Sequence, residues 1–406
     1  MNQTDRDRLV LSAVVFSVLF AQVLLYPGIP DLVAALGATP AEWAGDVGEV
    51  LDAGMWFLTA EFLGFILFAS LWGALSDASG HRTLLVSVCA VLGGTGYLVL
   101  AVLPTIGTIP YETILVIRFV QGAVTIGAFS LAITTLMDLD GGHGRNMGAA
   151  GLAIGFGTAL GAPVGGQLYG FGALVPLLGA AVLLFVAGLL ATLATDRTPT
   201  NTGSVLRTVS SLRARPSLAV PFAFGFVDRL TAGFFALVGT VYFQVTFGLD
   251  AAGTGILLGA FFVPFALLQY PLGRLSDRIG RIIPVAVGSL AYGMAVIAVF
   301  YAPSVVTAAL TMALVGVLGA LVAPATMALV TDLATESQRG VAMGGFNVFG
   351  SLGFLTGIVG GATLAARVDF ETAFLVVGFA EVVIAVVALP LLLRLDVPTL
   401  PWLESS

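Results

Sequence analysis

The sequence is dominated by apolar runs that are long enough to cross a lipid bilayer. A bilayer core of about 30 Å requires roughly 20 apolar residues in a helix. Hydrophobic residues make up 58% of the 406 residues and charged residues only 10%, whereas soluble domains carry about 25% charged residues. Twelve such runs occur, at about 9–32, 53–74, 83–104, 113–137, 147–169, 173–195, 219–246, 253–275, 283–302, 305–330, 341–364 and 372–394.

A polar stretch divides the twelve runs into two sets of six. We therefore predict an N-terminal six-helix bundle at 1–195, a cytoplasmic linker at 196–218, and a C-terminal six-helix bundle with a short cytoplasmic tail at 219–406. The expected fold class is an all-α membrane protein with twelve transmembrane helices in two pseudo-symmetric bundles.

The placement of arginine predicts the orientation in the membrane. All sixteen basic residues are Arg, and basic residues concentrate in the cytoplasmic loops of such proteins. If the N-terminus is inside, thirteen Arg fall on the cytoplasmic side, Arg367 falls outside, and Arg118 and Arg229 lie within apolar runs. We expect a multi-pass protein of the cell membrane with both termini in the cytoplasm.

The charge balance also bears on habitat. The net charge is −7 and the chain contains no lysine. This composition favours a halophile, because high salt screens the self-repulsion of an acidic surface. A GC-rich genome, which also favours Arg over Lys, is the alternative.

One loop sequence occurs twice. Residues 73–80 read GALSDASG and residues 273–280 read GRLSDRIG, so the same residue recurs at five positions 200 apart. Each copy follows the second apolar run of its half. Repeats of six helices in parallel are a known transporter architecture. We predict that the two halves superpose, with Asp77 and Asp277 at equivalent cytoplasmic positions.

The repeated loop resembles the signature of the major facilitator superfamily. That signature lies between the second and third helices and reads Gly-x-Leu-x-Asp-x-x-Gly-Arg. Two copies in register are a far more specific match than one, and the resemblance covers essentially the whole chain. It implies a twelve-helix transporter fold. The matching residues are Gly73, Leu75, Asp77 and Gly80 in the first copy, and Gly273, Leu275, Asp277, Gly280 and Arg281 in the second.

The resemblance implies that these loops brace the two halves in one state of the transport cycle. A carboxylate can accept hydrogen bonds from the backbone N–H groups at a helix N-terminus, where the helix dipole favours negative charge. By resemblance, Asp77 meets the start of the run at 341–364, and Asp277 meets the start of the run at 147–169. The bracing is expected to favour the outward-open state.

The two loop copies differ at one position. The second copy is expected to form an acid–base–acid cluster of Asp277, Arg281 and Asp332. In the first copy, His81 occupies the position that matches Arg281, and Arg82 follows it. The sequence therefore does not decide whether a basic residue links Asp77 to Asp138 in the first copy. A pH-sensitive link through the histidine is one alternative.

Charged residues inside the apolar runs are candidates for proton coupling. Arg118 lies about six residues from the outer end of its run, roughly 9 Å deep at 1.5 Å per residue, and needs a partner or water there. Asp228 and Arg229 are sequence neighbours, so they point about 100° apart and each needs another partner. The candidates are Glu61, Arg118, Asp228, Arg229 and Glu381.

The three acids outnumber the two Arg. A carboxyl group that is buried without a cation favours its protonated form, which is what a proton carrier requires. We hypothesise that Glu61 or Asp228 binds the coupling proton and that Arg118 tunes its affinity. Glu381 is the weaker candidate, because the resemblance places its helix at the periphery. The alternative is that the surplus acid is permanently protonated or hydrated.

Two further motifs resemble those of the superfamily. Arg118, Gln121 and Gly122 resemble its Arg-x-x-Gln-Gly motif, whose Arg is assigned a part in proton coupling. A structural clamp is the alternative.

A second set of residues resembles the glycine-rich motif of drug–proton antiporters, although its proline stands one place later than usual. These residues are Gly157, Gly161, Pro163, Gly165 and Gly166.

The glycine spacing has a simpler explanation in helix packing. Gly157, Gly161 and Gly165 share one helix face, and small residues there let two helices approach closely. The run at 341–364 repeats the pattern with Gly353, Gly357 and Gly361.

These features together predict a secondary active transporter. We expect proton-coupled export of a small, fairly apolar compound by alternating access. A proton symporter or facilitator for a small metabolite is the alternative, and a membrane-embedded enzyme or sensor is a more distant one.

The sequence has no hydrolase, metalloprotease or phosphate-loop motif. One cysteine and two histidines make a metal site unexpected. No enzyme activity, cofactor or nucleic acid is expected. The expected partners are the solute, protons and the lipid bilayer, and the expected state is a monomer.

Overall fold

The computed structural model describes residues 3–38, 46–140, 142–196, 216–335 and 339–395. These residues form helices and no strands, which confirms the predicted all-α fold. Most of the linker and the C-terminal tail lie outside the described residues.

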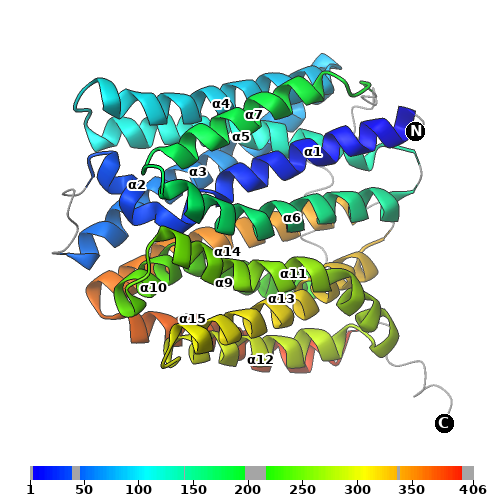
Figure 1. Cartoon of the computed structure of the whole chain (residues 1–406). Coiled ribbons are helices and arrows are strands. Elements are labelled where there is room, and N and C mark those ends of the chain that lie inside the picture. Colours follow the sequence, from blue (N-terminus) through cyan, green and yellow to red (C-terminus); the bar gives the residue numbers. More distant parts are fainter. Residues whose placement is uncertain (1–2, 39–45, 141, 197–215, 336–338, 396–406) are drawn as a thin grey trace, which may run out of the picture. The chain divides into compact units, whose positions relative to one another are not determined.

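The helices follow one another in two series (Figure 1). The first comprises α1 (Gln3–Val23), the short helix η1 (Tyr26–Gly28), α2 (Ile29–Ala35), α3 (Val47–Ser79), α4 (Arg82–Ile106), α5 (Tyr111–Met137), α6 (His143–Tyr169) and α7 (Val175–Ala191). The second comprises η2 (Pro216–Leu218), α9 (Ala219–Phe234), the π-helical turn η3 (Phe235–Gly239), α10 (Thr240–Phe247), α11 (Ala251–Ile279), α12 (Ile282–Phe300), α13 (Val305–Leu333), α14 (Arg339–Arg367) and α15 (Phe370–Leu392).

The described helices account for the predicted spans. Eleven stretches are long and apolar enough to cross a membrane, and the 17-residue α7 is a shorter apolar helix in the sixth position. The first stretch joins α1 to α2, and the sixth long one joins α9 to α10. The chain is therefore a multi-pass membrane protein.

Several helices extend beyond their apolar runs. Helix α3 has 33 residues, about 50 Å at 1.5 Å per residue. It begins where the side chain of Asp46 accepts a hydrogen bond from the backbone N–H of Gly48 at 2.8 Å. It ends at Gly80, whose φ of 67° is a left-handed conformation that glycine adopts without strain. The prediction of a loop at 73–80 is therefore wrong for most of its length, because residues 73–79 form the last two turns of α3 and only Gly80 and His81 lie between α3 and α4.

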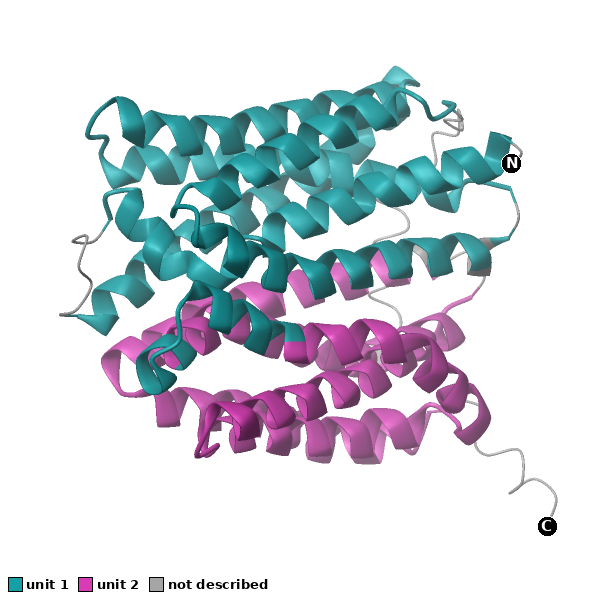
Figure 2. Ribbon diagram, in the orientation of Figure 1, with its two compact units in different colours: residues 1–202, 243–259 teal, residues 203–242, 260–406 magenta. Residues whose placement is uncertain are grey.

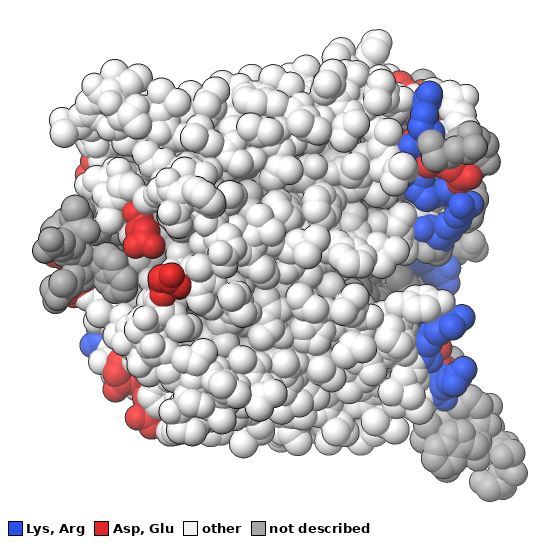
Figure 3. Space-filling model, in the orientation of Figure 1, with Lys and Arg blue, Asp and Glu red and all other residues white. Residues whose placement is uncertain are grey.

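The molecular surface matches a lipid environment. On the face shown in Figure 3, charged residues lie toward the two ends of the helices, and the surface between them is uncharged. Large apolar side chains such as Leu67, Leu189 and Val387 are exposed on that surface. Water would not tolerate an apolar surface of this extent, whereas lipid does.

The chain forms two compact units (Figure 2). Unit 1 comprises Met1–Thr202 and Phe243–Gly259, and unit 2 comprises Gly203–Tyr242 and Ala260–Ser406. The units therefore differ from the predicted halves at 243–259. The side chain of Gln244 donates a hydrogen bond to the carbonyl oxygen of Pro27 at 2.8 Å. A Cβ on Gly255 would lie 2.5 Å from the carbonyl oxygen of Ala162. These contacts attach the segment to unit 1.

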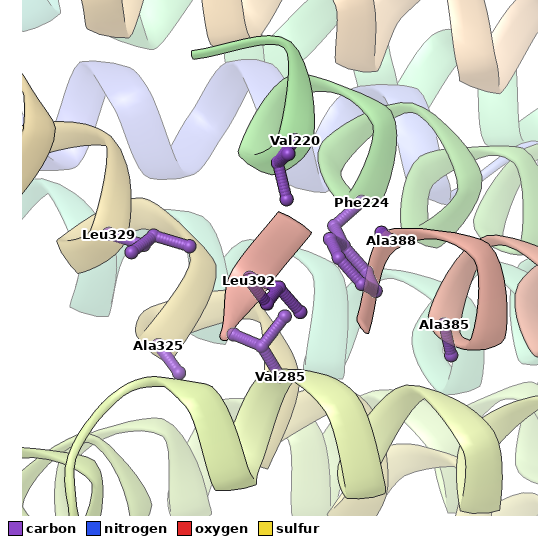
Figure 4. Packing of buried hydrophobic residues seen from close by; sticks show 8 residues of the cluster. All are labelled: Val220, Phe224, Val285, Ala325, Leu329, Ala385, Ala388 and Leu392. Carbon is purple, nitrogen blue, oxygen red and sulfur yellow. The ribbon is translucent and has the colours of Figure 1, made fainter. Parts of the chain in front are cut away.

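Unit 2 has an apolar core to which four helices contribute (Figure 4). The aromatic ring of Phe224 lies among small and branched side chains, so the helices can pack closely there. The cluster consists of Val220 and Phe224 from α9, Val285 from α12, Ala325 and Leu329 from α13, and Ala385, Ala388 and Leu392 from α15.

Glycine stripes set the closest helix contacts in both units. In unit 1, a Cβ on Gly165 of α6 would collide with the backbone of Leu24. In unit 2, a Cβ on Gly353 of α14 would collide with the carbonyl oxygen of Phe226 on α9. The stripes therefore lie where the packing explanation places them.

Gly353→Ala should destabilise the protein. The added methyl group meets backbone, which cannot rotate away, so we expect a loss of roughly 1–3 kcal/mol. Gly344→Ala in the same helix is the matched control, because nothing lies within 4 Å of its Cβ position. Unfolding can be followed with a thiol-reactive fluorogenic dye, since the single cysteine, Cys89, is buried. Equal stability of the two variants would contradict the packing role of the stripe.

Candidate functional site

An ion pair lies inside unit 1 between α3 and α5. The Nη2 atom of Arg118 donates a hydrogen bond to Oε2 of Glu61 at 2.6 Å, and both side chains are 0% exposed. The Nη1 atom of Arg118 donates to Oε1 of Gln121 at 2.6 Å. The pair therefore unites two of the predicted coupling residues with the middle residue of the Arg-x-x-Gln-Gly motif.

Aromatic and hydroxyl groups complete this buried cluster. The guanidinium carbon of Arg118 lies 4.6 Å from the ring centre of Phe57 and 5.1 Å from that of Tyr97. Aromatic faces attract cations at such distances. The hydroxyl of Tyr97 also donates to Oε1 of Glu61, at 3.4 Å. Neither Phe57 nor Tyr97 carries a sequence signal, because each is one aromatic residue among many in apolar runs.

Two glycines allow α3 and α5 to approach closely at this point. A Cβ on Gly122 would lie 2.5 Å from the carbonyl oxygen of Glu61, and one on Gly64 would lie 2.6 Å from that of Phe119. The close approach brings Arg118 within hydrogen-bonding distance of Glu61. The final glycine of the motif therefore has a clear packing role beside the ion pair.

The buried pair suits a proton-dependent change of state. With the partners together, each charge neutralises the other in a site that is closed to solvent. If the helices separate, a carboxylate without its cation favours protonation in a low-dielectric environment. Removing one partner alone leaves an uncompensated buried charge, which is strongly destabilising.

The remaining candidates lie in unit 2. Asp228 and Arg229 are partly buried on α9 and are charged neighbours. The stem of Arg229 lies against α14, with its Cγ 3.1 Å from a Cβ placed on Gly350. Glu381 on α15 is 0% exposed. Unit 2 therefore does not repeat the pairing of Glu61 with Arg118.

The two signature segments, at the ends of α3 and α11, hold equivalent ion clusters. In unit 1, Arg82 contacts Asp77 at 3.2 Å and Asp138 at 2.5 Å, and its Nε donates to the hydroxyl of Ser76 at 3.0 Å. In unit 2, Arg281 contacts the three corresponding residues, Asp277, Asp332 and Ser276.

Arg82, and not His81, therefore links Asp77 to Asp138. The ring Nδ1 of His81 lies 2.6 Å from the carbonyl oxygen of Ser79, within its own loop. The alternative of a pH-sensitive histidine link is wrong for this structure. Arg82 is the first residue of α4, whereas Arg281 is the residue just before α12, and both guanidinium groups reach the equivalent carboxylates of their own unit.

Arg82→Gln should lower the stability of unit 1. It removes a guanidinium that serves two carboxylates, and we expect a loss of about 1–2 kcal/mol because both carboxylates are partly exposed. His81→Gln is the matched control and should leave stability unchanged. The dye assay at Cys89 measures both variants. A larger loss of stability for His81→Gln than for Arg82→Gln would show that His81, and not Arg82, links the two carboxylates.

The glycine-rich motif of α6 presents two faces. Gly157, Gly161 and Gly165 face α1, where Gly157 approaches the carbonyl oxygen of Phe16. Pro163 instead faces the first turns of α11, where a Cβ on Gly259 would lie 2.7 Å from its ring. Gly166 approaches the same segment at Ala251. The motif therefore packs against two different helices within unit 1.

Comparison with known proteins places these features in a family. The sequence model of the Major Facilitator Superfamily matches residues 11–243 and 222–406. The tetracycline resistance protein, class G, of Vibrio anguillarum is 28% identical over 354 residues, which cover 83% of this chain and 84% of that protein.

Solved structures share the fold. The nucleoside transporter NupG has a TM-score of 0.72 at 12% identity and covers 98% of this chain and 100% of its own. A D-xylose-proton symporter has a TM-score of 0.73 at 15% identity, and the match covers 96% of this chain and 98% of the symporter. The predicted two-bundle fold is confirmed.

Proposed function

Because the chain belongs to the major facilitator superfamily of transporters, we propose that it uses a proton gradient to export a small, fairly apolar compound by alternating access. It is a transporter and not an enzyme. The observation that carries the proposal is the ion pair of Glu61 and Arg118. The Nη2 atom of Arg118 lies 2.6 Å from Oε2 of Glu61, and both side chains are 0% exposed.

Proton coupling follows from the chemistry of this pair. While Arg118 is close, Glu61 is stabilised as a carboxylate. When α3 and α5 shift relative to one another, Glu61 loses its cation and takes up a proton. A change of conformation thereby becomes a change of protonation. Arg118 sets the proton affinity through its distance, and Asp228 with Arg229 is the second candidate pair.

The export direction is supported by a relative. The tetracycline resistance protein matches most of this chain, and resistance is consistent with removal of a compound from the cell. The Arg side chains visible in Figure 3 gather mainly at the end of the helices at which Figure 1 marks the N-terminus. Because basic residues favour the cytoplasmic side, this distribution supports a cytoplasmic N-terminus. Residence in the cell membrane is part of the same proposal. The clusters around Arg82 and Arg281 are proposed to brace the loops in one state of the cycle.

Transport by the purified protein in liposomes tests this function. A panel of apolar antibiotics, sugars and nucleosides is offered under an imposed pH gradient. We expect an apolar compound to be concentrated, and an uncoupler that dissipates the gradient should stop the process. Uptake of a sugar or nucleoside together with protons would favour the symporter, and transport that ignores the gradient would favour the facilitator.

A further inference from the structure

A second buried carboxyl group lies in unit 2, on helices other than those that hold the Glu61–Arg118 pair. Glu381 of α15 is 0% exposed. The hydroxyl of Ser289 on α12 donates a hydrogen bond to its Oε1 at 3.1 Å. Its Oε2 has no hydrogen-bond partner among the described residues. A Cβ on Gly293 would lie 2.9 Å from the Cβ of Glu381, so α12 and α15 approach each other closely at this residue.

The neighbours of Glu381 are hydroxyl groups and another acid. Helices α12, α9 and α14 pack against α15. Tyr292 of α12 interacts with both Glu381 and Asp228, and its hydroxyl is hydrogen-bonded to Thr231 of α9. Asp228 of α9 is a charged neighbour of Glu381. The group that faces Glu381 from α9 is therefore negative.

No cation contacts Glu381 in the part of the chain that the structure describes. Arg229 follows Asp228 on α9, but its stem lies against Gly350. The titratable residues of α14 are Arg339 and Arg367, which stand at the two ends of that helix. An ionised Glu381 would thus be a buried charge with one neutral donor and a negative neighbour, which is a costly arrangement.

We propose that Glu381 is a second proton-binding site, which holds an exchangeable proton in this conformation. The proton resides on Glu381 because Asp228 is partly exposed and has Arg229 beside it, so Asp228 is the better place for the negative charge. Transfer between them is balanced: an O–H bond of Glu381 breaks, an O–H bond of Asp228 forms, and the total charge is unchanged.

The ligand of this site is a proton and not a metal ion. Hard cations such as Ca²⁺ surround themselves with six or more oxygen ligands. Oε2 of Glu381 has no partner, and groups of three or more His, Cys, Asp or Glu that could hold a metal are absent from the described residues. A proton needs no such shell. The site does not depend on the identity of the transported compound.

Infrared spectroscopy of the purified full-length protein tests the proposal directly. At neutral pH, the spectrum should contain a carboxylic-acid C=O band that disappears in Glu381→Gln. The band should remain in Glu371→Gln, which removes an exposed glutamate from the same helix. Ser289→Ala should keep the band but move it to higher frequency, because the donor to the carbonyl oxygen is lost. Transfer to D₂O should shift the band, since the proton exchanges.

Two results would overturn the proposal. If Glu381→Gln removes no band from a folded protein, Glu381 is ionised. If the band stays unshifted after prolonged incubation in D₂O, the proton is permanent and the carboxyl group is structural. Glu61→Gln should leave the band intact. The infrared test of Glu381 and the transport test of Glu61 are therefore independent, and either proposal can fail while the other holds.

Discussion

Glu61→Gln is expected to abolish proton-driven uphill transport while it leaves downhill exchange of the solute intact. The amide has nearly the shape of the carboxyl group and can still accept the hydrogen bond from Arg118, but it cannot bind and release a proton. Alternating access then continues without coupling. Parallel measurements of uphill uptake and of exchange at equal pH in liposomes separate the two activities.

Asp228→Asn is the matched control for this substitution, because it also converts a carboxyl group inside a span to an amide. It should retain more proton-driven transport than Glu61→Gln, since Asp228 is only partly buried and has no direct hydrogen bond to Arg118. If Asp228→Asn alone loses uphill transport, the coupling proton binds in unit 2. If both variants still concentrate the solute against its gradient, neither residue binds the coupling proton.

Arg118→Gln is expected to cost roughly 3–5 kcal/mol of stability, the range for removal of one partner from a buried ion pair. Glu61 would then be a fully buried carboxylate with only the hydroxyl of Tyr97 as a donor. Exposure of Cys89 to the thiol-reactive dye during denaturation measures this loss.

The double variant Glu61→Gln with Arg118→Gln provides the control for this prediction. It removes both charges and keeps two polar side chains of similar shape. It should therefore recover much of the stability that Arg118→Gln loses, because no uncompensated charge remains. Additive losses in the double variant would show that the two side chains do not interact.

The spans and the signature repeat could be predicted from the sequence because both are local, although the repeat forms the ends of α3 and α11 and not loops. An apolar run of about 20 residues predicts a membrane helix without reference to its neighbours. The two loop copies at 73–80 and 273–280 announce their equivalence by sequence alone. The cap at Asp46 and the left-handed turn at Gly80 explain why α3 is longer than its apolar run.

The pairing of side chains depends on the helix faces that meet, and the sequence does not supply these. Glu61 and Arg118 are 57 positions apart, and only the contact of α3 with α5 brings them together. The charge count predicted a surplus acid but favoured Glu61 and Asp228 over Glu381. The surplus acid without a cation is Glu381, because α15 turns that residue toward α12 and not toward lipid.

Other differences have equally local causes. Arg82 stands one place after the position that matches Arg281, yet its long side chain makes the contacts expected of position 81. The segment at 243–259 joins unit 1 through side-chain and glycine contacts that no repeat in the sequence reveals. The adaptation to high salt that the lysine-free composition favours stays a prediction.

The central claim is that solute movement and the protonation of Glu61 are coupled. Its most direct test is the proton release that follows addition of the transported solute to purified protein in weakly buffered solution, read with a pH-sensitive dye. The wild-type protein should release protons in proportion to the solute bound, and Glu61→Gln should bind the solute without that release. Equal proton release by the wild type and Glu61→Gln would contradict the account.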